Sequence, residues 1–493
     1  MAILTAKTAY GTVKGVPSLK NPEHSVFRGI PFAKPPVGEL RFAPPIEPDS
    51  WAGERLCDAF GPDCVQKSRF GGETGNISED CLYLNVFTPA ERHDEKLPVL
   101  FWIYGGGFRG GKSSSPEFDG EAINSHGAIL VTINYRCGAL GFFAHPELEK
   151  RYAQSSNLGL LDQIQALKWV KNNISAFGGD PDRVMPFGQS AGGVSVRMLL
   201  TSPLAAGLFS RAVVQSGGGL NEADPVRPAA DFTDMCVRCM EHLGWTFEDV
   251  MRRDALEVID RLENAAREVV PGDAVGYFQP FIDGVTLTDV PGKLIAEGRY
   301  PDIPVMCGTV AGDSWMFSRL VRERIGDNVN YFRGFSYSPG MTWAMHQVKT
   351  GRTPIFTYYM DRIQPQRKPM GQGGAFMRRG APPYGARTFH GSEIAYIFGT
   401  LDEKAKSTIE GFTEADHEMS SIMTDYWVNF AKNGDPNGEG LPIWPKYTAE
   451  TPYAMHFGEM IKAEDIVLSD EERKVLIHTE NNPGMLDTVE GLI

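Results

Sequence analysis

One segment constrains the fold of this chain more than any other: Pro186-Phe187-Gly188-Gln189-Ser190-Ala191-Gly192-Gly193. It contains Gly-x-Ser-x-Gly, follows a short apolar run, and leads into a helical pattern over residues 194–200. A strand, a tight turn and a helix hold a serine in a strained backbone conformation with its Oγ exposed. Such a turn requires small neighbours, which Gly188 and Gly192 supply. The pattern therefore predicts that Ser190 is a nucleophile.

Strand-like runs alternate with helical patterns along the rest of the chain. Residues 82–87 alternate apolar and polar side chains, as a half-buried strand does, and residues 98–104 and 128–134 are continuous apolar runs. Continuous runs fit strands of a sheet that is covered on both faces. Residues 160–173 carry apolar side chains at helical spacing. We therefore expect an α/β fold with a large, mostly parallel central sheet and helices on both faces.

Two ranges depart from this alternation and predict insertions. Residues 221–275 look mainly helical and are expected to form a cap, and residues 314–387 are interpreted as a further helical or loop insertion. Near the N-terminus, residues 8–16 indicate a hairpin and residues 27–36 a Pro-rich surface turn. Because no internal repeat and no clear linker is found, we expect residues 1–493 to form a single domain.

Composition and charge exclude several classes of protein. Apolar residues make up 42% and charged residues 22% of the chain, which is typical of a globular protein with a large core. The formal net charge of -14 argues against nucleic acid and against anionic membrane surfaces as partners. No apolar run of the length of a transmembrane helix occurs, and residues 1–7 lack the pattern of a secretory signal. We therefore expect a cytoplasmic protein, and the oligomeric state stays open.

The cysteines predict neither a disulfide framework nor a metal site. The chain has seven, which is too few and an odd number. Cys64 and Cys81 are close enough in sequence to be bridged, but in a cytoplasm two thiols are the default. Cys236 and Cys239 form a lone Cys-x-x-Cys within a helical pattern, so we interpret them as two neighbouring helix positions.

A second glycine-rich turn supplies donors for a developing oxyanion. The strand-like run up to Tyr104 continues directly into Gly105-Gly106-Gly107-Phe108. Three glycines after a buried strand allow backbone N–H groups to point toward one position. We expect Gly106 and Gly107 to form an oxyanion hole together with the N–H of Ala191.

The same turn has an alternative interpretation as a phosphate loop. Gly-x-x-x-x-Gly-Lys-Ser matches from Gly106 to Ser113. We disfavour this alternative because a serine turn lies downstream and no strand with a magnesium-binding Asp is evident.

These motifs, taken together and in order, resemble the type B carboxylesterases, the α/β-hydrolase family that includes cholinesterases and para-nitrobenzyl esterases. The resemblance covers nearly the whole chain. Besides the serine turn and the three glycines, the matching segments are 27–33, 78–86, 134–142, 178–181 and 215–217.

The resemblance places the other two members of a catalytic triad. The family's acid lies in a segment similar to residues 308–314, which puts Asp313 where the family usually has Glu. Since Asp is one methylene shorter, its loop must lie closer to the histidine, while the carboxylate can still accept a hydrogen bond from the imidazole. The family's histidine lies in a stretch similar to residues 389–399, which makes His390 the base. The order Ser190, Asp313, His390 is that of α/β-hydrolases.

The assignment of Asp313 as the acid has two alternatives. In the first, Asp313 is a loop aspartate that caps the next helix. In the second, another carboxylate is the acid. Asp283 is the first other carboxylate to test as the acid, although its setting in Phe281-Ile282-Asp283-Gly284 is typical of a turn residue.

Further positions follow from the resemblance. Gln189 stands before Ser190 where the family usually has Glu, and Ser216 matches a serine near the triad, or is simply a serine at the end of a strand. Glu79 and Arg136 match positions that pair as a structural salt bridge in the family. We expect Phe108 to contact the substrate. Gln189, together with the lack of a counterpart to the cationic-site tryptophan of cholinesterases among residues 65–80, weakens a choline-ester interpretation.

The resemblance implies a serine hydrolase that cleaves carboxylic esters through an acyl-enzyme, without cofactor or metal. An amidase, a thioesterase or a lactonase would use the same triad, and a non-catalytic binding protein is the alternative from another class.

A basic stretch points to a small-molecule ester that carries a negative group. Residues 361–387 hold six basic side chains and one acid in a chain of net charge -14, and the stretch ends three residues before His390. We expect Arg378 and Arg379 to contact the substrate, because guanidinium groups bind carboxylates in a planar, bidentate way. The alternative is a solvated loop whose arginines pair with the acidic surface or with a partner subunit.

Overall fold

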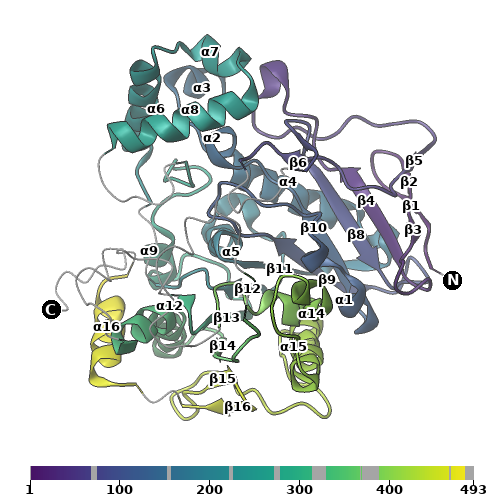
Figure 1. The fold of residues 1–493 in the computed structure, drawn as a ribbon, viewed down its shortest axis with the longest axis vertical. Helices are drawn as coiled ribbons and strands as arrows, with labels where there is room; N and C mark the ends of the chain where they lie inside the picture. Colours follow the sequence, from purple (N-terminus) through teal and green to yellow (C-terminus); the bar gives the residue numbers. More distant parts are fainter. Residues whose placement is uncertain are drawn as a thin grey trace.

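One large sheet forms the centre of the fold (Figure 1). The computed structural model of the protein describes residues 2–67, 75–152, 157–220, 226–270, 278–313, 329–366, 368, 388–465 and 468–483. Across these residues the strands lie in the order β16 (Ile461–Glu464), β15 (Ala454–Phe457), β14 (Phe356–Met360), β13 (Val305–Val310), β12 (Ala212–Gln215), β11 (Gly179–Gln189), β9 (Leu97–Ile103), β10 (Ile129–Ile133), β8 (Tyr83–Thr88), β4 (Ser25–Pro31) and β3 (Val16–Pro17).

Pairing within the sheet is mostly parallel. The strands from β15 to β10 in this order all pair in parallel, whereas β16 at one end and β8, β4 and β3 at the other pair antiparallel. The central strands are buried almost throughout, β9 and β10 from end to end apart from Leu97. The prediction of a large, mostly parallel sheet is therefore confirmed.

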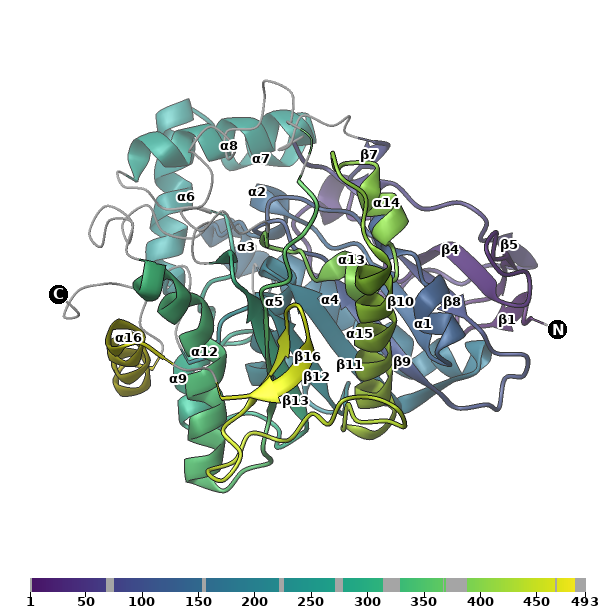
Figure 2. The same cartoon turned by 60° about the horizontal axis from the view of Figure 1, so that its bottom comes forward.

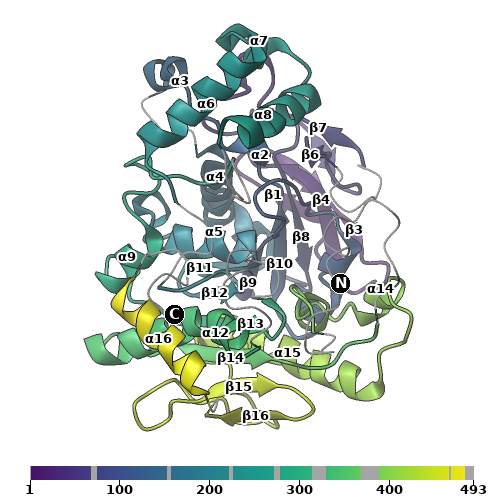
Figure 3. The same cartoon turned by 60° about the vertical axis from the view of Figure 1, so that its left-hand side comes forward.

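Helices cover both faces of the sheet (Figures 2 and 3). On one face α4 (Leu158–Asn173) and α5 (Ala191–Thr201) pack against β11, with α9 (Pro291–Ala296) and α12 (Val329–Thr350) beside them. On the other face α15 (Glu414–Asn433) packs against β9 and β11, together with α1 (Glu121–Ser125). None of the helices in the described ranges combines the length and the apolar character needed to span a membrane.

The remaining elements are short or peripheral. They are the small sheet of β1 (Thr5–Lys7), β2 (Thr12–Lys14) and β5 (Glu54–Leu56), the pair β6 (Asp63–Cys64) and β7 (Ile77–Ser78), and the helices α2 (Gly138–Gly141), α3 (Pro146–Arg151), α13 (Ile394–Ile397), α14 (Leu401–Ala405) and α16 (Asp470–Asn481). An N-terminal hairpin is present, but it spans residues 5–14 rather than the predicted 8–16: β1 and β2 pair antiparallel, and residues 8–11 form the turn between them.

Three helices from the range 221–275, which was predicted to be mainly helical, lie together at the top of Figure 1: α6 (Ala229–Leu243), α7 (Phe247–Arg252) and α8 (Ala255–Val269). Their role as a cap stays a prediction, and we call them the cap helices. Helix α8 packs against α6 and against α2. Cys236 and Cys239 are buried neighbours on α6, as predicted. The range 314–387, by contrast, is not an insertion throughout, because it contains β14, a parallel strand of the central sheet.

One predicted surface turn is wrong. Residues 25–31 form strand β4, which overlaps the first half of the turn predicted at 27–36 and pairs antiparallel with β8. Phe27 and Ile30 are fully buried, since pairing with β8 carries their side chains into the core. The prolines of the segment signalled a turn, but the apolar residues before them decide the structure.

The predicted salt bridge between Glu79 and Arg136 is also wrong. Arg136 donates from Nε and Nη2 to both carboxylate oxygens of Asp162, at 2.9 and 2.8 Å. Glu79 accepts two hydrogen bonds from Arg41, at 2.7 and 2.8 Å. Each arginine thus has a bidentate carboxylate partner of its own, the stronger geometry for an ion pair. Arg41 also donates to the carbonyl oxygens of Val250 and Arg253, which ties the cap helices to the core.

Cys64 and Cys81 form a disulfide. The sequence did not decide whether these two cysteines are bridged, and the default of two thiols is wrong. The bridge closes the base of a loop that contains Gln66 and Glu79. The other five cysteines are free and buried.

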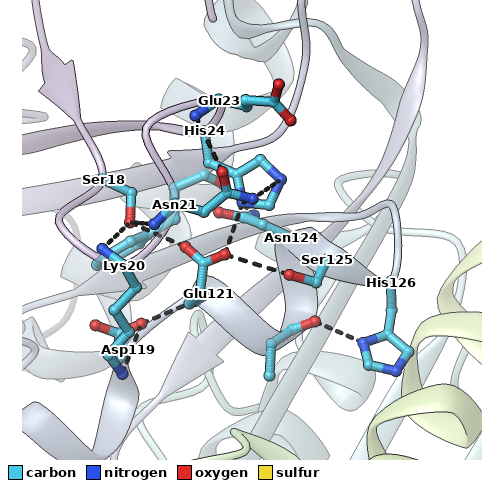
Figure 4. A network of polar contacts seen from close by, with 12 residues as sticks. Ser18, Lys20, Asn21, Glu23, His24, Asp119, Glu121, Asn124, Ser125 and His126 are labelled. Carbon is cyan, nitrogen blue, oxygen red and sulfur yellow. Dashed lines mark hydrogen bonds and ion pairs between the residues drawn. The ribbon is translucent and has the colours of Figure 1, made fainter.

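A polar network anchors the antiparallel end of the sheet to α1 (Figure 4). Glu121 of α1 accepts a hydrogen bond from Ser18, at 2.9 Å, and lies 2.9 Å from Nδ1 of His24. Lys20 forms an ion pair with Asp119 at 3.6 Å. Because these contacts join the loop before β4 to a helix that covers the sheet, we interpret the network as structural.

Candidate active site

The loops that carry the predicted site residues leave the sheet at the same edge. Strands β9 and β11 pair in parallel, with Trp102 opposite Phe187 and Ile103 opposite Gly188. The glycine turn after β9 and the serine turn after β11 therefore emerge side by side. Carboxyl ends of neighbouring parallel strands are the usual place for a site in open α/β sheets.

Ser190 occupies the junction between β11 and α5 in a strained backbone conformation. Its φ is 59° and its ψ is -127°, values that cost a non-glycine residue on the order of 1–3 kcal/mol. The turn is tight because the backbones touch: a Cβ on Gly192 would overlap the carbonyl oxygen of Ile103, and one on Gly188 would meet the backbone of Gly192. The predicted strand, turn and helix are all present.

The triple-glycine turn packs directly against the serine turn. A Cβ on Gly105 would lie 3.0 Å from the Cβ of Ser190 and 2.5 Å from the carbonyl oxygen of Gln189. Gly106 and Gly107 have φ values of 123° and 63°, which a residue with a side chain rarely adopts. Gly105 is thus held against the serine turn, and Gly106 and Gly107 follow it directly in the chain.

Ala191 and Phe108 border the two turns. Ala191 is the first residue of α5, where N–H groups lack a partner within the helix. Phe108 has a positive φ of 58°, and its buried ring packs edge-on against Phe142. Its predicted contact with a substrate stays a prediction.

Asp313 and His390 are brought together across 77 positions of the sequence. The Oδ1 of Asp313 lies 2.6 Å from Nδ1 of His390, and both side chains are buried. The other carboxylate oxygen, Oδ2, accepts hydrogen bonds from the hydroxyl of Thr309 and, at 3.2 Å, from the N–H of Val310. Burial alone would raise the pKa of Asp313, but the neighbouring His390 and these hydrogen bonds hold it below its usual value.

The loop of Asp313 reaches the histidine by direct contact between the two backbones. A Cβ on Gly312, the residue before Asp313, would overlap the carbonyl oxygen of Thr388. A glycine at this position therefore allows the shorter acid to approach the imidazole, as the shorter side chain requires.

Gln189 and Ser216 both lie beside this pair. The amide nitrogen of Gln189 is 3.1 Å from Nε2 and 3.3 Å from Nδ1 of His390, so an amide rather than a carboxylate faces the imidazole. Ser216 follows β12 with a φ of 48° and is close enough to Asp313 to help lower its pKa, although no hydrogen bond of ordinary geometry joins them.

Asp283 has a structural role. Its Oδ1 accepts hydrogen bonds from the N–H groups of Val285, Thr286 and Leu287, at 2.7 to 3.0 Å, and its Oδ2 accepts one from Asn157 at 2.6 Å. Its carboxylate thus organises a turn, as its sequence setting indicated.

The basic stretch is described only in part. Arg378 and Arg379 lie outside the described residues. Arg362 donates to Asp416 at 2.8 Å, and Lys368 donates to the carbonyl oxygen of Lys406 at 3.0 Å. Arg362 therefore has a carboxylate partner within the chain, although Asp416 is buried rather than on the acidic surface that the alternative interpretation expected, and Lys368 has a backbone partner.

Glu393 is a buried acid near the triad that the sequence analysis did not single out. Its side chain is completely buried, and neither carboxylate oxygen has a hydrogen-bond partner of ordinary geometry. Its pKa is raised to about 7: burial and the charge of Asp313 raise it, and His390 and the side chain of Gln215 offset part of the rise. The only signal in the sequence was an acid three positions after the candidate base.

A sheet of this topology, with a serine on a strained turn after a central strand, defines an α/β-hydrolase. The carboxylesterase family model matches residues 3–336 and 322–474. The chain belongs to the carboxylesterase family and is a carboxylic ester hydrolase.

Relatives support this assignment along most of the chain. The fumonisin B1 esterase of Sphingopyxis macrogoltabida is 34% identical over 488 residues, which cover 90% of this chain and 84% of that protein. The para-nitrobenzyl esterase of Bacillus subtilis is 33% identical over 507 residues, which cover 95% and 97%. A solved PNB esterase structure, 32% identical, superposes with a TM-score of 0.80 over 96% of this chain and 99% of that one.

Glu393→Gln should change how stability depends on pH. An acid whose pKa is higher in the folded state binds protons more tightly there, so the free energy of unfolding falls as pH rises from 4.5 to about 7. Glutamine has no proton to lose. Relative to the parent, the variant should gain stability between pH 4.5 and pH 8, by as much as about 3 kcal/mol.

Urea unfolding at several pH values measures this difference. Glu418→Gln, at an exposed position of α15, is the matched control and should follow the parent. Parallel profiles for the parent and Glu393→Gln would contradict the raised pKa.

Proposed function

We propose that the chain hydrolyses carboxylic esters through an acyl-enzyme on Ser190, with His390 as general base and Asp313 as the residue that orients it. The observation that carries the proposal is the strained backbone of Ser190 against the glycine turn. Strain of this kind persists where the surrounding packing enforces it, and it clusters at catalytic residues.

In the first half of the reaction the imidazole of His390 removes the proton of Ser190, and Oγ attacks the acyl carbon. Asp313 accepts a hydrogen bond from Nδ1 of His390, so Nε2 is the nitrogen that accepts the proton of Ser190. The N–H groups of Gly106, Gly107 and Ala191 stabilise the negative charge that develops on the carbonyl oxygen.

The leaving alcohol takes the proton from His390 as the tetrahedral intermediate collapses. A water molecule, deprotonated by the same imidazole, then attacks the acyl-enzyme. The second tetrahedral intermediate releases the acid as the oxygen of Ser190 leaves and takes the proton back from His390. An amidase, a thioesterase or a lactonase would use the same steps with another leaving group. We place Gln189 and Ser216 around the triad as residues that hold its geometry.

The proposed compartment is the cytoplasm. Five free cysteines support it, whereas the Cys64–Cys81 disulfide counts against it. The redox state of these two cysteines, in protein isolated from cells under thiol-trapping conditions, tests the compartment. Two thiols would support the cytoplasm, and a disulfide would support an oxidising compartment.

Ser190→Ala should abolish ester hydrolysis while the protein stays folded. Loss of a nucleophile that acts together with a base lowers kcat by at least about 10³-fold. Initial rates with a para-nitrophenyl ester, together with the melting temperature, provide the measurement. Near-parental turnover in a folded variant would exclude Ser190 as the nucleophile, whereas a folded parent protein without turnover would favour the non-catalytic alternative.

Asp313→Asn should lower kcat on the order of 10³-fold or more with a small change in melting temperature, because the imidazole loses the carboxylate that fixes its tautomer. Asp283→Asn is the matched control: it should affect stability through its turn and leave kcat nearly unchanged. If the two variants exchanged these effects, the acid of the triad would be Asp283.

We also propose a preference for esters that carry a negative group. The family alone does not decide this point, since its members include proteins named for fumonisin B1 and for para-nitrobenzyl esters. The basic stretch before His390 supports the preference, although Arg362 is occupied by Asp416. Arg109, directly after Phe108, adds a largely buried cation, which forms an ion pair with Glu263 at 3.6 Å.

Esters that differ only by a distal carboxylate test the preference. The charged ester should have the higher kcat/KM, and the advantage should shrink at high salt because screening weakens attraction to the site. Arg378→Ala with Arg379→Ala, and separately Arg109→Gln, should reduce the ratio of the two kcat/KM values. Equal or better kcat/KM for the neutral ester at low and high salt would refute the preference.

A further inference from the structure

The loop of residues 105–111, which begins with the triple-glycine turn and which we call the oxyanion turn, is held by the side chain of Gln66. Gln66 donates from Nε2 to the carbonyl oxygen of Gly111 at 2.7 Å, and its Oε1 accepts a hydrogen bond from the N–H of the same residue at 2.8 Å. One amide therefore satisfies both backbone groups of Gly111. A paired contact of this kind fixes position and orientation together, which a single hydrogen bond does not.

The glycines that Gln66 holds lie against the glycines of the oxyanion hole. A Cβ on Gly106 would overlap the carbonyl oxygen of Gly110, and one on Gly111 would lie 2.8 Å from the carbonyl oxygen of Gly105. The backbone thus folds back on itself within one short loop. A displacement of Gly111 has to move Gly105 and Gly106 because no space separates them.

Gln66 itself is anchored on the other side. Its Nε2 also donates to the carbonyl oxygen of Cys64 at 3.0 Å, and the disulfide to Cys81 fixes that cysteine. Glu79, two positions before Cys81, accepts hydrogen bonds from Nε and Nη2 of Arg41. The amide of Gln66 therefore connects a cross-linked, ion-paired loop to the oxyanion turn.

We propose that Gln66 is a positioning residue for the oxyanion hole. It touches neither the nucleophile nor the base in the described contacts, and it acts through the backbone of Gly110 and Gly111. The inference rests on the proposed function, in which Gly106 and Gly107 stabilise the oxyanion. Donors of this kind stabilise the transition state only when they are held in place before the reaction. Loss of Gln66 should therefore lower kcat and leave KM nearly unchanged.

Gln66→Met tests the proposal, since methionine has a similar size and cannot form the paired contact. We expect kcat for a para-nitrophenyl ester to fall at least about tenfold, while KM changes less than about twofold. An aryl trifluoromethyl ketone supplies the second readout. The oxygen of Ser190 adds to its carbonyl carbon as His390 takes the hydroxyl proton, and the oxyanion of the resulting hemiketal occupies the hole. The affinity for the ketone should therefore fall by the same factor as kcat/KM.

Asn437→Leu is the matched control. Asn437, on the loop after α15, forms the same paired contact with Trp444, accepting from its N–H at 2.7 Å and donating to its carbonyl oxygen at 2.8 Å. Its loss should lower the melting temperature and leave both kcat and ketone affinity unchanged. Gln66→Glu, which keeps the acceptor and removes the donor, is the second variant should Gln66→Met not fold, and it should also lower kcat selectively.

The outcomes separate this proposal from the assignment of the triad. If Ser190→Ala is inactive and a folded Gln66 variant keeps parental kcat and ketone affinity, the positioning role is wrong and the triad stands. If both Gln66 variants lose kcat and ketone affinity only in proportion to the fraction of protein that has unfolded, the role is structural and the proposal is overturned. If Ser190→Ala keeps its activity, the proposed function itself fails.

Discussion

The strained backbone at Ser190 is the constraint on which the rest of the site depends. The turn can hold a positive φ at a serine only because β9, β11 and α5 approach each other with no side chains between them. Gly188 and Gly192 make this approach possible at the serine, and Gly105 does so at the neighbouring turn. The same packing that strains Ser190 therefore brings the oxyanion turn against it. The long parallel sheet supplies the rigid strands from which both turns emerge.

The acid and the base reach this point from strands and loops far along the chain. Asp313 follows β13 and His390 lies shortly before α13, and the contact between Gly312 and Thr388 brings their loops together. The neighbourhood has one carboxylate that carries its charge, Asp313, and one whose pKa is raised by burial, Glu393. A second buried acid close to the triad costs stability as it ionises, which is why the pH dependence of unfolding is informative about this site.

Much of this arrangement could be predicted from the sequence because it depends on residues that are close together in the chain. The serine turn, the triple glycine and the apolar runs of β9 and β10 each combine a residue pattern with a backbone requirement. The errors have a common cause. The partners of Glu79 and Arg136 are set by which loops meet in space, and neither Arg41 nor Asp162 is near them in sequence. Gln66 and Glu393 were not predicted because their surroundings also depend on the folded structure. Gln66 forms its hydrogen bonds with a glycine 45 positions away, and the pKa of Glu393 is raised mainly by burial.

The most direct test of the account is to find where a fluorophosphonate probe reacts. Such probes label a serine only when a base activates it and an oxyanion hole accepts the phosphoryl oxygen, so the reaction depends on the whole site. Intact-protein mass spectrometry followed by peptide mapping should find one adduct per chain, on Ser190. An adduct on another residue, or no adduct on a folded protein that hydrolyses esters, would contradict the account.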